Sequence, residues 1–392
     1  MLDTRSSRRL AVGLACLALV VSTAGCASRR PAATDGPLLT TKSWRPIADP
    51  PLTRRPGRAA VWTGTEMLVW GGAFLCATDR CDEEIPQPAS DGAAYAPTPD
   101  RWRPLAPSPL AARDRPAMVR AADEVLVWGG SAGPQFFADG AVYAPRSDTW
   151  RPMPASPLSP RSGVSAVWTG RELLVWGGSA RGAFYNDGAA FNPATGSWTS
   201  LPVAPLAGRT GAATAWTGDE LVVWGGAGDA GHFNDGAALD VVAGTWRPLP
   251  PAPLESRGGQ ATVWTGSAMV IWGGGNAQRV FADGASFEPG TNRWSSLPEA
   301  PLQARAGPAS VWTGFDLLIW GGGGDNFDFF GDGAAYSPLT GRWATLVTSA
   351  LQGRGSPAGL WTGADFLVWG GIVHNADLTS TTAALDGTRY DP

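Results

Sequence analysis

The sequence is poor in the residues that build metal and redox sites. Its 392 residues include two histidines, His232 and His374, and four cysteines. Two of the cysteines lie within the first 26 residues, and Cys76 and Cys81 have neither the spacing nor the second pair that a zinc site needs. The composition therefore predicts no bound cofactor.

Charge is also scarce. Charged residues make up 16% of the chain, and the net charge is -4. Because no basic surplus is present to neutralise phosphates, we expect no nucleic acid partner. Glycine, proline and tryptophan are abundant instead, with 52, 34 and 20 residues. This composition is typical of a turn-rich chain with aromatic anchors and argues against a helical bundle.

The N-terminus has the layout of an export signal. Arginines within the first nine residues precede an apolar run at residues 10–21, and small residues then lead to Cys26. The run is too short to span a bilayer as a helix. The segment resembles a bacterial lipoprotein signal, in which Cys26 becomes the lipidated first residue of the mature chain. Thr23 stands where that signal usually has leucine, so ordinary secretion is the alternative.

These features predict three segments: a signal peptide at residues 1–25, a linker at 26–43 that begins at the lipidated cysteine, and a folded region at 44–392. They predict an exported protein that is anchored in the cell membrane on its extracytoplasmic side. In such an oxidising compartment we expect Cys76 and Cys81 to form a disulfide bond.

Internal repetition dominates the rest of the chain. The string Trp-Gly-Gly closes an apolar run seven times, at Trp70, Trp128, Trp176, Trp224, Trp272, Trp320 and Trp369, mostly at intervals of 48 residues. A second tryptophan precedes each of these by 26 positions, from Trp44 to Trp343. A third, in Trp-Thr-Gly, occurs in six units and is replaced by Arg120 in the second, which accounts for all 20 tryptophans.

Each unit contains four short segments typical of strands, separated by glycine and proline. In the third unit we expect strands a to d at residues 164–169, 173–176, 188–191 and 198–201. No helical segment is available for the crossovers of a parallel sheet, so a radial array of antiparallel four-stranded blades fits. The sequence thus predicts an all-β fold, a seven-bladed β-propeller.

The units resemble the kelch repeat, which has a double glycine after strand b, an aromatic residue in strand c and a tryptophan in strand d. The second unit supplies Gly129-Gly130, Tyr143 and Trp150 at these places. The order recurs over residues 44–392, with Leu239 in place of the strand c aromatic in the fourth unit. The resemblance implies a kelch-type propeller similar to the central domain of galactose oxidase.

The two chain ends predict how the ring closes. The last unit stops at Pro392, before any strand d, whereas the segment around Trp44 has the pattern of a strand d with no strands a to c before it. We expect this N-terminal strand to complete blade seven, which leaves no open edge between the first and last blades.

All variation in the length of the units falls between strands b and c. In an antiparallel blade the b–c loop and the d–a connection lie at one end, and the a–b and c–d turns lie at the other. We call these two ends the loop face and the turn face. A scaffold that is constant except for loops on one face is consistent with function at the loop face.

Two charged positions recur on the loop face. An arginine precedes strand a at Arg55, Arg113, Arg161, Arg209, Arg257, Arg305 and Arg354, and an aspartate opens strand c at Asp91, Asp139, Asp187, Asp235, Asp283, Asp332 and Asp386. The arginines either form a ring that receives carboxylates or pair with the aspartates to build each blade. Five loops add an aromatic residue, at Phe137, Tyr185, Phe233, Phe281 and Phe330, either exposed for stacking on sugars or packed beneath the loops.

The predicted ligand site lies where the two longest b–c loops meet. These loops, residues 73–90 and 372–385, belong to blades one and seven, which are neighbours in a closed ring. The candidate contacts are Asp82, Glu83, Glu84, His374 and Asp377, together with Arg55 and Arg354. This mixture suits a glycan or a protein or peptide ligand, and its carboxylates also suit a weak calcium site. Two solvated loops that shield the seam are the alternative.

We therefore expect a binding or scaffolding module that uses its loop face. A carbohydrate-active enzyme such as a sugar mutarotase is the alternative, because its acid–base chemistry needs only a carboxylate and a cation in a pocket. We do not expect the copper chemistry of galactose oxidase, because His232 and His374 fall on nearly opposite blades.

Overall fold

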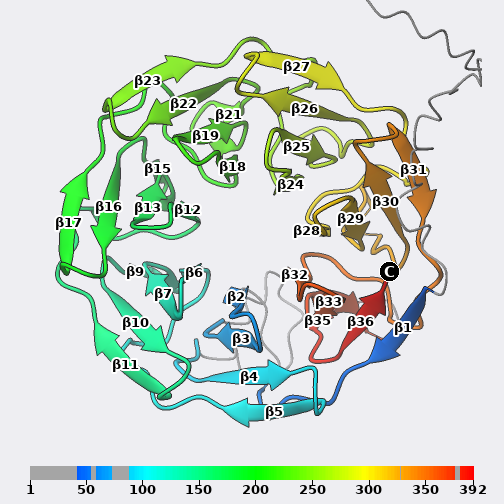
Figure 1. Cartoon of the computed structure of the whole chain (residues 1–392), viewed down its shortest axis with the longest axis horizontal. Helices are drawn as coiled ribbons and strands as arrows, with labels where there is room; N and C mark the ends of the chain where they lie inside the picture. The colour runs from blue at the N-terminus through cyan, green and yellow to red at the C-terminus, as the bar shows by residue number, and fades with distance from the viewer. Residues whose placement is uncertain (1–41, 54–58, 73–87, 327, 376–379) are drawn as a thin grey trace, which may run out of the picture. The chain divides into compact units, whose positions relative to one another are not determined.

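A computed structural model describes residues 42–53, 59–72, 88–326, 328–375 and 380–392. These residues form strands and no helix, and they belong to one compact unit, Thr41–Pro392. The strands assemble into seven four-stranded antiparallel sheets. Figure 1 shows the sheets arranged radially, with strand a of each blade innermost and strand d at the rim. The seven-bladed β-propeller predicted from the repeat is confirmed.

The blades are numbered in chain order, and their strands are given in the order a to d. Blade 1 comprises β2 (Ala59–Trp62), β3 (Met67–Trp70), β4 (Gly92–Ala96) and β5 (Arg101–Pro104). Blade 2 comprises β6 (Ala117–Ala121), β7 (Glu124–Trp128), β10 (Gly140–Ala144) and β11 (Thr149–Pro152). Blade 3 comprises β12 (Ser165–Trp168), β13 (Leu173–Trp176), β16 (Gly188–Asn192) and β17 (Ser197–Ser200). Blade 4 comprises β18 (Ala213–Trp216), β19 (Glu220–Trp224), β22 (Gly236–Asp240) and β23 (Thr245–Pro248).

The remaining blades follow the same plan. Blade 5 comprises β24 (Ala261–Trp264), β25 (Met269–Trp272), β26 (Gly284–Glu288) and β27 (Arg293–Ser296). Blade 6 comprises β28 (Ala309–Trp312), β29 (Leu317–Trp320), β30 (Gly333–Ser337) and β31 (Arg342–Thr345). Blade 7 comprises β32 (Ala358–Trp361), β33 (Phe366–Trp369), β36 (Gly387–Asp391) and β1 (Ser43–Pro46). In blade 3 the predicted and observed strand ends agree within one residue.

Within the described residues, four b–c loops also carry a short ladder that the sequence did not predict. The pairs are β8 (Ser131–Ala132) with β9 (Gln135–Phe136), β14 (Ser179–Ala180) with β15 (Ala183–Phe184), β20 (Ala227–Gly228) with β21 (Gly231–His232), and β34 (Ile372–His374) with β35 (Thr381–Ala383). These ladders stiffen the loops that rise from the loop face.

The hydrophobic core is divided among the blade interfaces. Seven clusters of buried side chains each join two neighbouring blades. Strand b is packed on both sides, so Leu173–Trp176 of β13 is buried at every position. This explains why strand b reads as a continuous apolar run and does not alternate.

A tryptophan pair recurs at every blade interface. The strand b indole of one blade contacts the strand d indole of the next, with ring centroids 5.4–6.1 Å apart. The strand d indole also donates a hydrogen bond from Nε1 to a backbone carbonyl, at 2.7–3.1 Å. The strand b and strand d tryptophans of every unit therefore hold neighbouring blades together.

The predicted closure by the N-terminal strand is confirmed. Strand β1 pairs with β36 from Ser43 opposite Asp391 to Pro46 opposite Thr388. Trp44 contacts Trp320 of blade 6 with ring centroids 5.9 Å apart. The interface that β1 completes thus has the same tryptophan pair as the other six blade interfaces.

Candidate functional site

The loop face is built on buried arginines that pair with aspartates of the same blade. The six described arginines of the repeat are at most 1% exposed, and each lies 2.5–2.9 Å from an aspartate Oδ1. Arg113, for example, donates through Nη1 to Asp139 and to the carbonyl of Gly129, and through Nε to the carbonyl of Ala111. The arginines therefore serve blade construction, the second of the two predicted roles.

The repeated aromatic residues pack against these arginines. Five guanidinium carbons lie 3.8–4.2 Å from the centroid of an aromatic ring, in the pairs Arg113–Phe137, Arg161–Tyr185, Arg209–Phe233, Arg257–Phe281 and Arg305–Phe330. Each ring stacks on the cation beneath the loop, which is a favourable cation–π arrangement when the cation is desolvated. The interpretation of packing beneath the loops is confirmed.

The aspartates remain accessible where the arginines are not. Their side chains are 41–57% exposed in the six pairs. A ligand that approaches the loop face therefore meets carboxylates held from below by guanidinium groups. The alternative interpretation, a free ring of arginines that receives carboxylates, is wrong for the six blades whose repeat arginine is described, because these arginines are buried and already paired with aspartates.

The double glycine fixes the position of the arginine of the next blade. Gly130 donates a backbone hydrogen bond to the carbonyl of Arg161 in the next blade, at 2.9 Å. Gly129 has φ +70°, and a Cβ atom there would lie 2.9 Å from the same carbonyl. Only glycine fits this close approach without strain. The arginine thus joins neighbouring blades through its backbone and braces its own blade through its side chain.

Blade 2 differs from the other blades at the two residues after the repeat arginine, Asp114 and Arg115. The residue after the arginine is Ser162, Thr210, Gly258, Ala306 and Gly355 in blades 3 to 7, but it is Asp114 in blade 2. Asp114 is 4% exposed, and its Oδ2 accepts a hydrogen bond from Arg115 Nε at 3.0 Å. Its Oδ1 is buried without a hydrogen-bond partner, and burial raises the pKa of the carboxyl group.

The sequence contained the signal for this site. An acid followed by a base stands in one unit where the others carry small residues, and glycine is the rule at the second of the two positions. Arg115 adopts φ +47°, a left-handed conformation that is unusual for arginine. The same left-handed backbone recurs at this place in blades 3 to 7, so the feature specific to blade 2 is the buried Oδ1 of Asp114, which makes this residue a candidate functional position.

The described part of the predicted ligand site contains His374 and Arg354. The His374 ring lies 4.7 Å from that of Phe329 in the neighbouring loop of blade 6, and its carbonyl accepts a hydrogen bond from Gln352. Arg354 is one of the buried arginines and pairs with Asp386 at 2.9 Å. In blade 7 a ligand therefore reaches the carboxylate of Asp386 before the guanidinium.

Several predicted residues lie outside the described residues. These are Arg55, Asp82, Glu83, Glu84 and Asp377 of the ligand site, Cys76 and Cys81 of the expected disulfide, and Cys26 of the expected anchor. The two blades that carry the predicted loops are neighbours, since Trp369 of blade 7 contacts Trp102 of blade 1 with centroids 5.4 Å apart.

The described residues include no group of three or more metal-ligating side chains that could hold an ion. They also contain no helix that is long and apolar enough to cross a membrane. The string from Gly129 to Gly133 has the spacing of a nucleophile elbow, but Ser131 is 4% exposed and belongs to strand β8. A nucleophile elbow would expose the serine at a turn between a strand and a helix.

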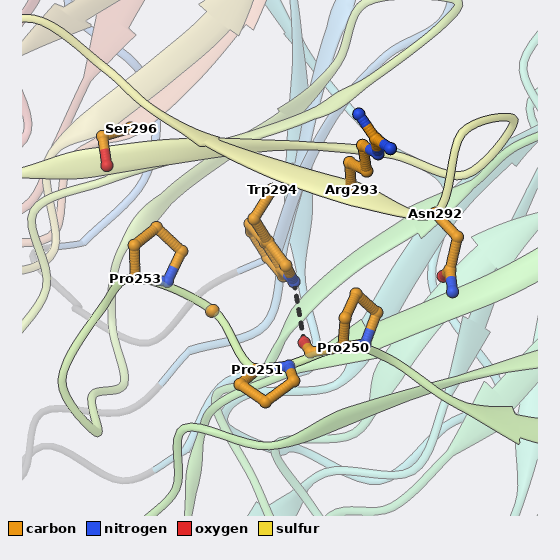
Figure 2. A pocket seen from close by; sticks show the side chains of 8 residues that line it. Pro250, Pro251, Pro253, Asn292, Arg293, Trp294 and Ser296 are labelled. Carbon is orange, nitrogen blue, oxygen red and sulfur yellow. Dashed lines mark hydrogen bonds between the residues drawn. The ribbon is translucent and has the colours of Figure 1, made fainter.

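A shallow groove of about 390 Å³ lies at the rim, between β27 and the connection from blade 4 (Figure 2). Figure 2 shows Trp294 between Pro250 and Pro253, with its Nε1 donating to the carbonyl of Pro250 at 3.0 Å. The same indole-to-carbonyl bond recurs at the other six interfaces. The groove is therefore a consequence of blade packing.

Comparison with known families agrees with the geometry. The KLHDC2/KLHL20/DRC7 kelch-repeats domain matches residues 57–252 and again residues 163–371. The second match is displaced by the spacing between Trp70 and Trp176, as expected when a model of repeats shifts by two blades. No curated protein matches the chain. Together with the seven blades, the double glycines and the tryptophan pairs, the match shows that the chain belongs to the kelch-repeat family.

Proposed function

We propose that this chain is an exported kelch propeller, anchored through a lipid on Cys26, that binds a protein or peptide ligand with its loop face. Kelch propellers are typically protein-binding or scaffold modules, and the family match carries this general role to the chain. Export and anchoring rest on the N-terminal sequence. The use of the loop face rests on the arrangement of its charges.

The observation that carries the proposal is the set of aspartates on this face. Each is half exposed, yet it is held by a buried arginine, so its position costs little further entropy when a ligand binds. Such carboxylates accept hydrogen bonds, most strongly from the charged donors of lysine and arginine. We therefore favour a protein or peptide with lysine or arginine side chains over a neutral glycan.

Asp114 and Arg115 add a second contact on the same face. The guanidinium of Arg115 is 56% exposed and is held by the buried carboxylate of Asp114, so it offers a hydrogen-bond donor to a ligand. The loops of blades 1 and 7 supply the remaining candidates, Glu83, Glu84 and His374, of which the first two rest on sequence alone.

A binding screen tests this proposal. Residues 41–392 would be applied to arrays of basic, neutral and acidic peptides and to a glycan array. We expect selective binding to basic peptides that weakens as salt is added, because salt screens exposed charges. Binding to glycans alone, or equal binding to acidic peptides, would contradict the protein-ligand assignment.

Variants then locate the contact. Asp235→Asn with Asp283→Asn keeps the side-chain volumes but removes the counter-ions of the buried Arg209 and Arg257, so binding is compared at a temperature at which the variant is shown to be folded. Binding of the selected peptide should then weaken about tenfold, or 1.4 kcal/mol. The triple variant Glu83→Ala, Glu84→Ala, His374→Ala should weaken it at least tenfold without changing the melting temperature. Asp219→Asn with Glu288→Gln, exposed on the turn face, is the matched control. An effect of the control alone would move the site to the turn face.

A further inference from the structure

The turn face exposes large apolar side chains in the sector of blade 6. Phe315 is 73% exposed there and Leu339 is 89% exposed, while Val242, 97% exposed, lies on the same face in blade 4. Phe315 and Leu339 are in the a–b and c–d turns of the same blade, blade 6. Charged residues flank these side chains: Asp316 and Asp365 lie in the a–b turns of blades 6 and 7, and Glu288, Arg293 and Arg342 are exposed beside the c–d turns of blades 5 and 6.

The turns do not need these apolar side chains. At the position of Phe315 the other blades carry Thr65, Asp123, Arg171, Asp219, Ser267 and Ala364. The hydrogen bonds of the turn come from Thr313, whose Oγ1 accepts from the amides of Phe315 and Asp316, as the threonines of other blades do. Leu339 likewise stands where blade 2 has Arg146 and blade 4 has Val242. The observed hydrogen bonds of the a–b turn therefore do not depend on the exposed phenyl group, and residues of different character occupy the position of Leu339.

The chain enters the propeller in the same sector. Strand β1 starts on the turn face, because Ser43 pairs with Asp391 at the end of strand c of blade 7. Lys42, just before it, is close enough to Asp316 for their charges to interact. Asp316 directly follows Phe315, so the point of entry and the exposed phenyl group are neighbours.

We propose that this sector of the turn face rests on the membrane surface, with Phe315 and Leu339 in the lipid interface. The inference rests on the proposed anchor at Cys26. The 17 residues from Cys26 to Ser43 span about 60 Å at full extension and roughly 23 Å as a flexible coil. A linker that ends on the turn face brings this face toward the lipid, and the loop face then points away and is free for a ligand.

A lipid surface fits this patch better than a protein partner does. A stable protein interface buries about 1,200–2,000 Å² in total, with a packed hydrophobic centre. Two exposed side chains in neighbouring turns are too little for that, whereas a few apolar side chains suffice at a membrane interface when the protein is already tethered. The lipid on Cys26 provides attachment, and the patch provides orientation.

The test tethers the propeller without relying on Cys26. Residues 41–392 form one compact unit and would carry an N-terminal hexahistidine tag bound to vesicles of phosphatidylethanolamine, phosphatidylglycerol and a nickel-chelating lipid. Hydrogen exchange would be compared between tethered and free protein. We expect the amides of Phe315 and Leu339 to exchange at least threefold more slowly when tethered, and the β14–β15 ladder on the loop face to be unchanged.

Variants and controls decide the outcome. Phe315→Ser with Leu339→Ser should abolish the slower exchange, and Val203→Ser, which removes a 68% exposed apolar side chain from the connection between blades 3 and 4, should not. Equal exchange in tethered and free protein would overturn the proposal. So would self-association of the free unit that the double variant removes, because a second copy would then cover the patch. Whether Cys26 carries a lipid is tested separately, by mass spectrometry of the N-terminal peptide from the membrane fraction.

Discussion

Replacing Trp44 by alanine should destabilise the propeller as much as the same change in the middle of the ring. Trp44 contacts Tyr390 and Trp320 with centroids 4.8 and 5.9 Å apart, and its Nε1 donates to the carbonyl of Val347 at 2.8 Å. Trp343 has nearly the same surroundings, with Tyr336 at 4.9 Å, Trp272 at 5.9 Å and a hydrogen bond of 3.0 Å to Pro298.

The magnitude follows from this packing. Truncation of a buried aromatic residue to alanine costs about 3–5 kcal/mol, and Trp44 is half buried, so we expect about 3 kcal/mol. Unfolding entropy for a unit of roughly 350 residues is about 0.7 kcal/mol/K, so the melting temperature should fall by about 4 °C. Removal of residues 1–50 should cost more, because β36 then also loses its partner strand.

Differential scanning calorimetry of four proteins tests the reasoning: residues 41–392, the same chain with Trp44→Ala, the same chain with Trp343→Ala, and a chain that begins at residue 51. If Trp44→Ala lowers the melting temperature much less than Trp343→Ala does, the seam is not equivalent to the other interfaces. An unchanged melting temperature in the truncated chain would refute closure by β1.

Three further outcomes follow from the structure. Arg257→Met should lower the free energy of unfolding by about 3 kcal/mol in urea, because a buried cation and its hydrogen bonds to Asp283 and Gly273 are lost. Arg279→Met breaks an exposed pair with Glu255 and should cost about 0–1 kcal/mol. Equal costs would contradict the structural role of Arg257. Burial raises the pKa of Asp114, so ionisation of this carboxyl group opposes folding as pH rises through the folded-state pKa. Asp114→Asn should therefore have a higher melting temperature than the parent at pH 7, and the difference should shrink as pH falls toward 4. A difference that grows in acid would show that the carboxylate stabilises the fold. Mass spectrometry of the membrane fraction should find Cys26 as a lipidated N-terminus, and a soluble chain with unmodified Cys26, or cleavage elsewhere, would contradict the anchor.

The architecture was readable from the sequence because a propeller repeats its own contacts. Tryptophan positions, double glycines and constant spacings each record one blade-to-blade contact, and seven copies make the pattern unambiguous. Ring closure could also be predicted from the sequence. The segment around Trp44 has the pattern of a strand d but no strands a to c before it, and the last unit lacks a strand d. The short ladders in the b–c loops were missed, because two-residue strands leave no periodicity.

Only the tertiary structure decided which charges face outward. The sequence places an arginine and an aspartate at one end of every blade, and either could have been the exposed partner. The arginine is buried because its neighbours close over it: an aromatic ring stacks on the guanidinium, and the carbonyl of the first glycine of the pair accepts one of its hydrogen bonds. The burial of Asp114 and the exposure of Phe315 and Leu339 are likewise properties of the assembled blades, because they depend on atoms that are distant in the chain.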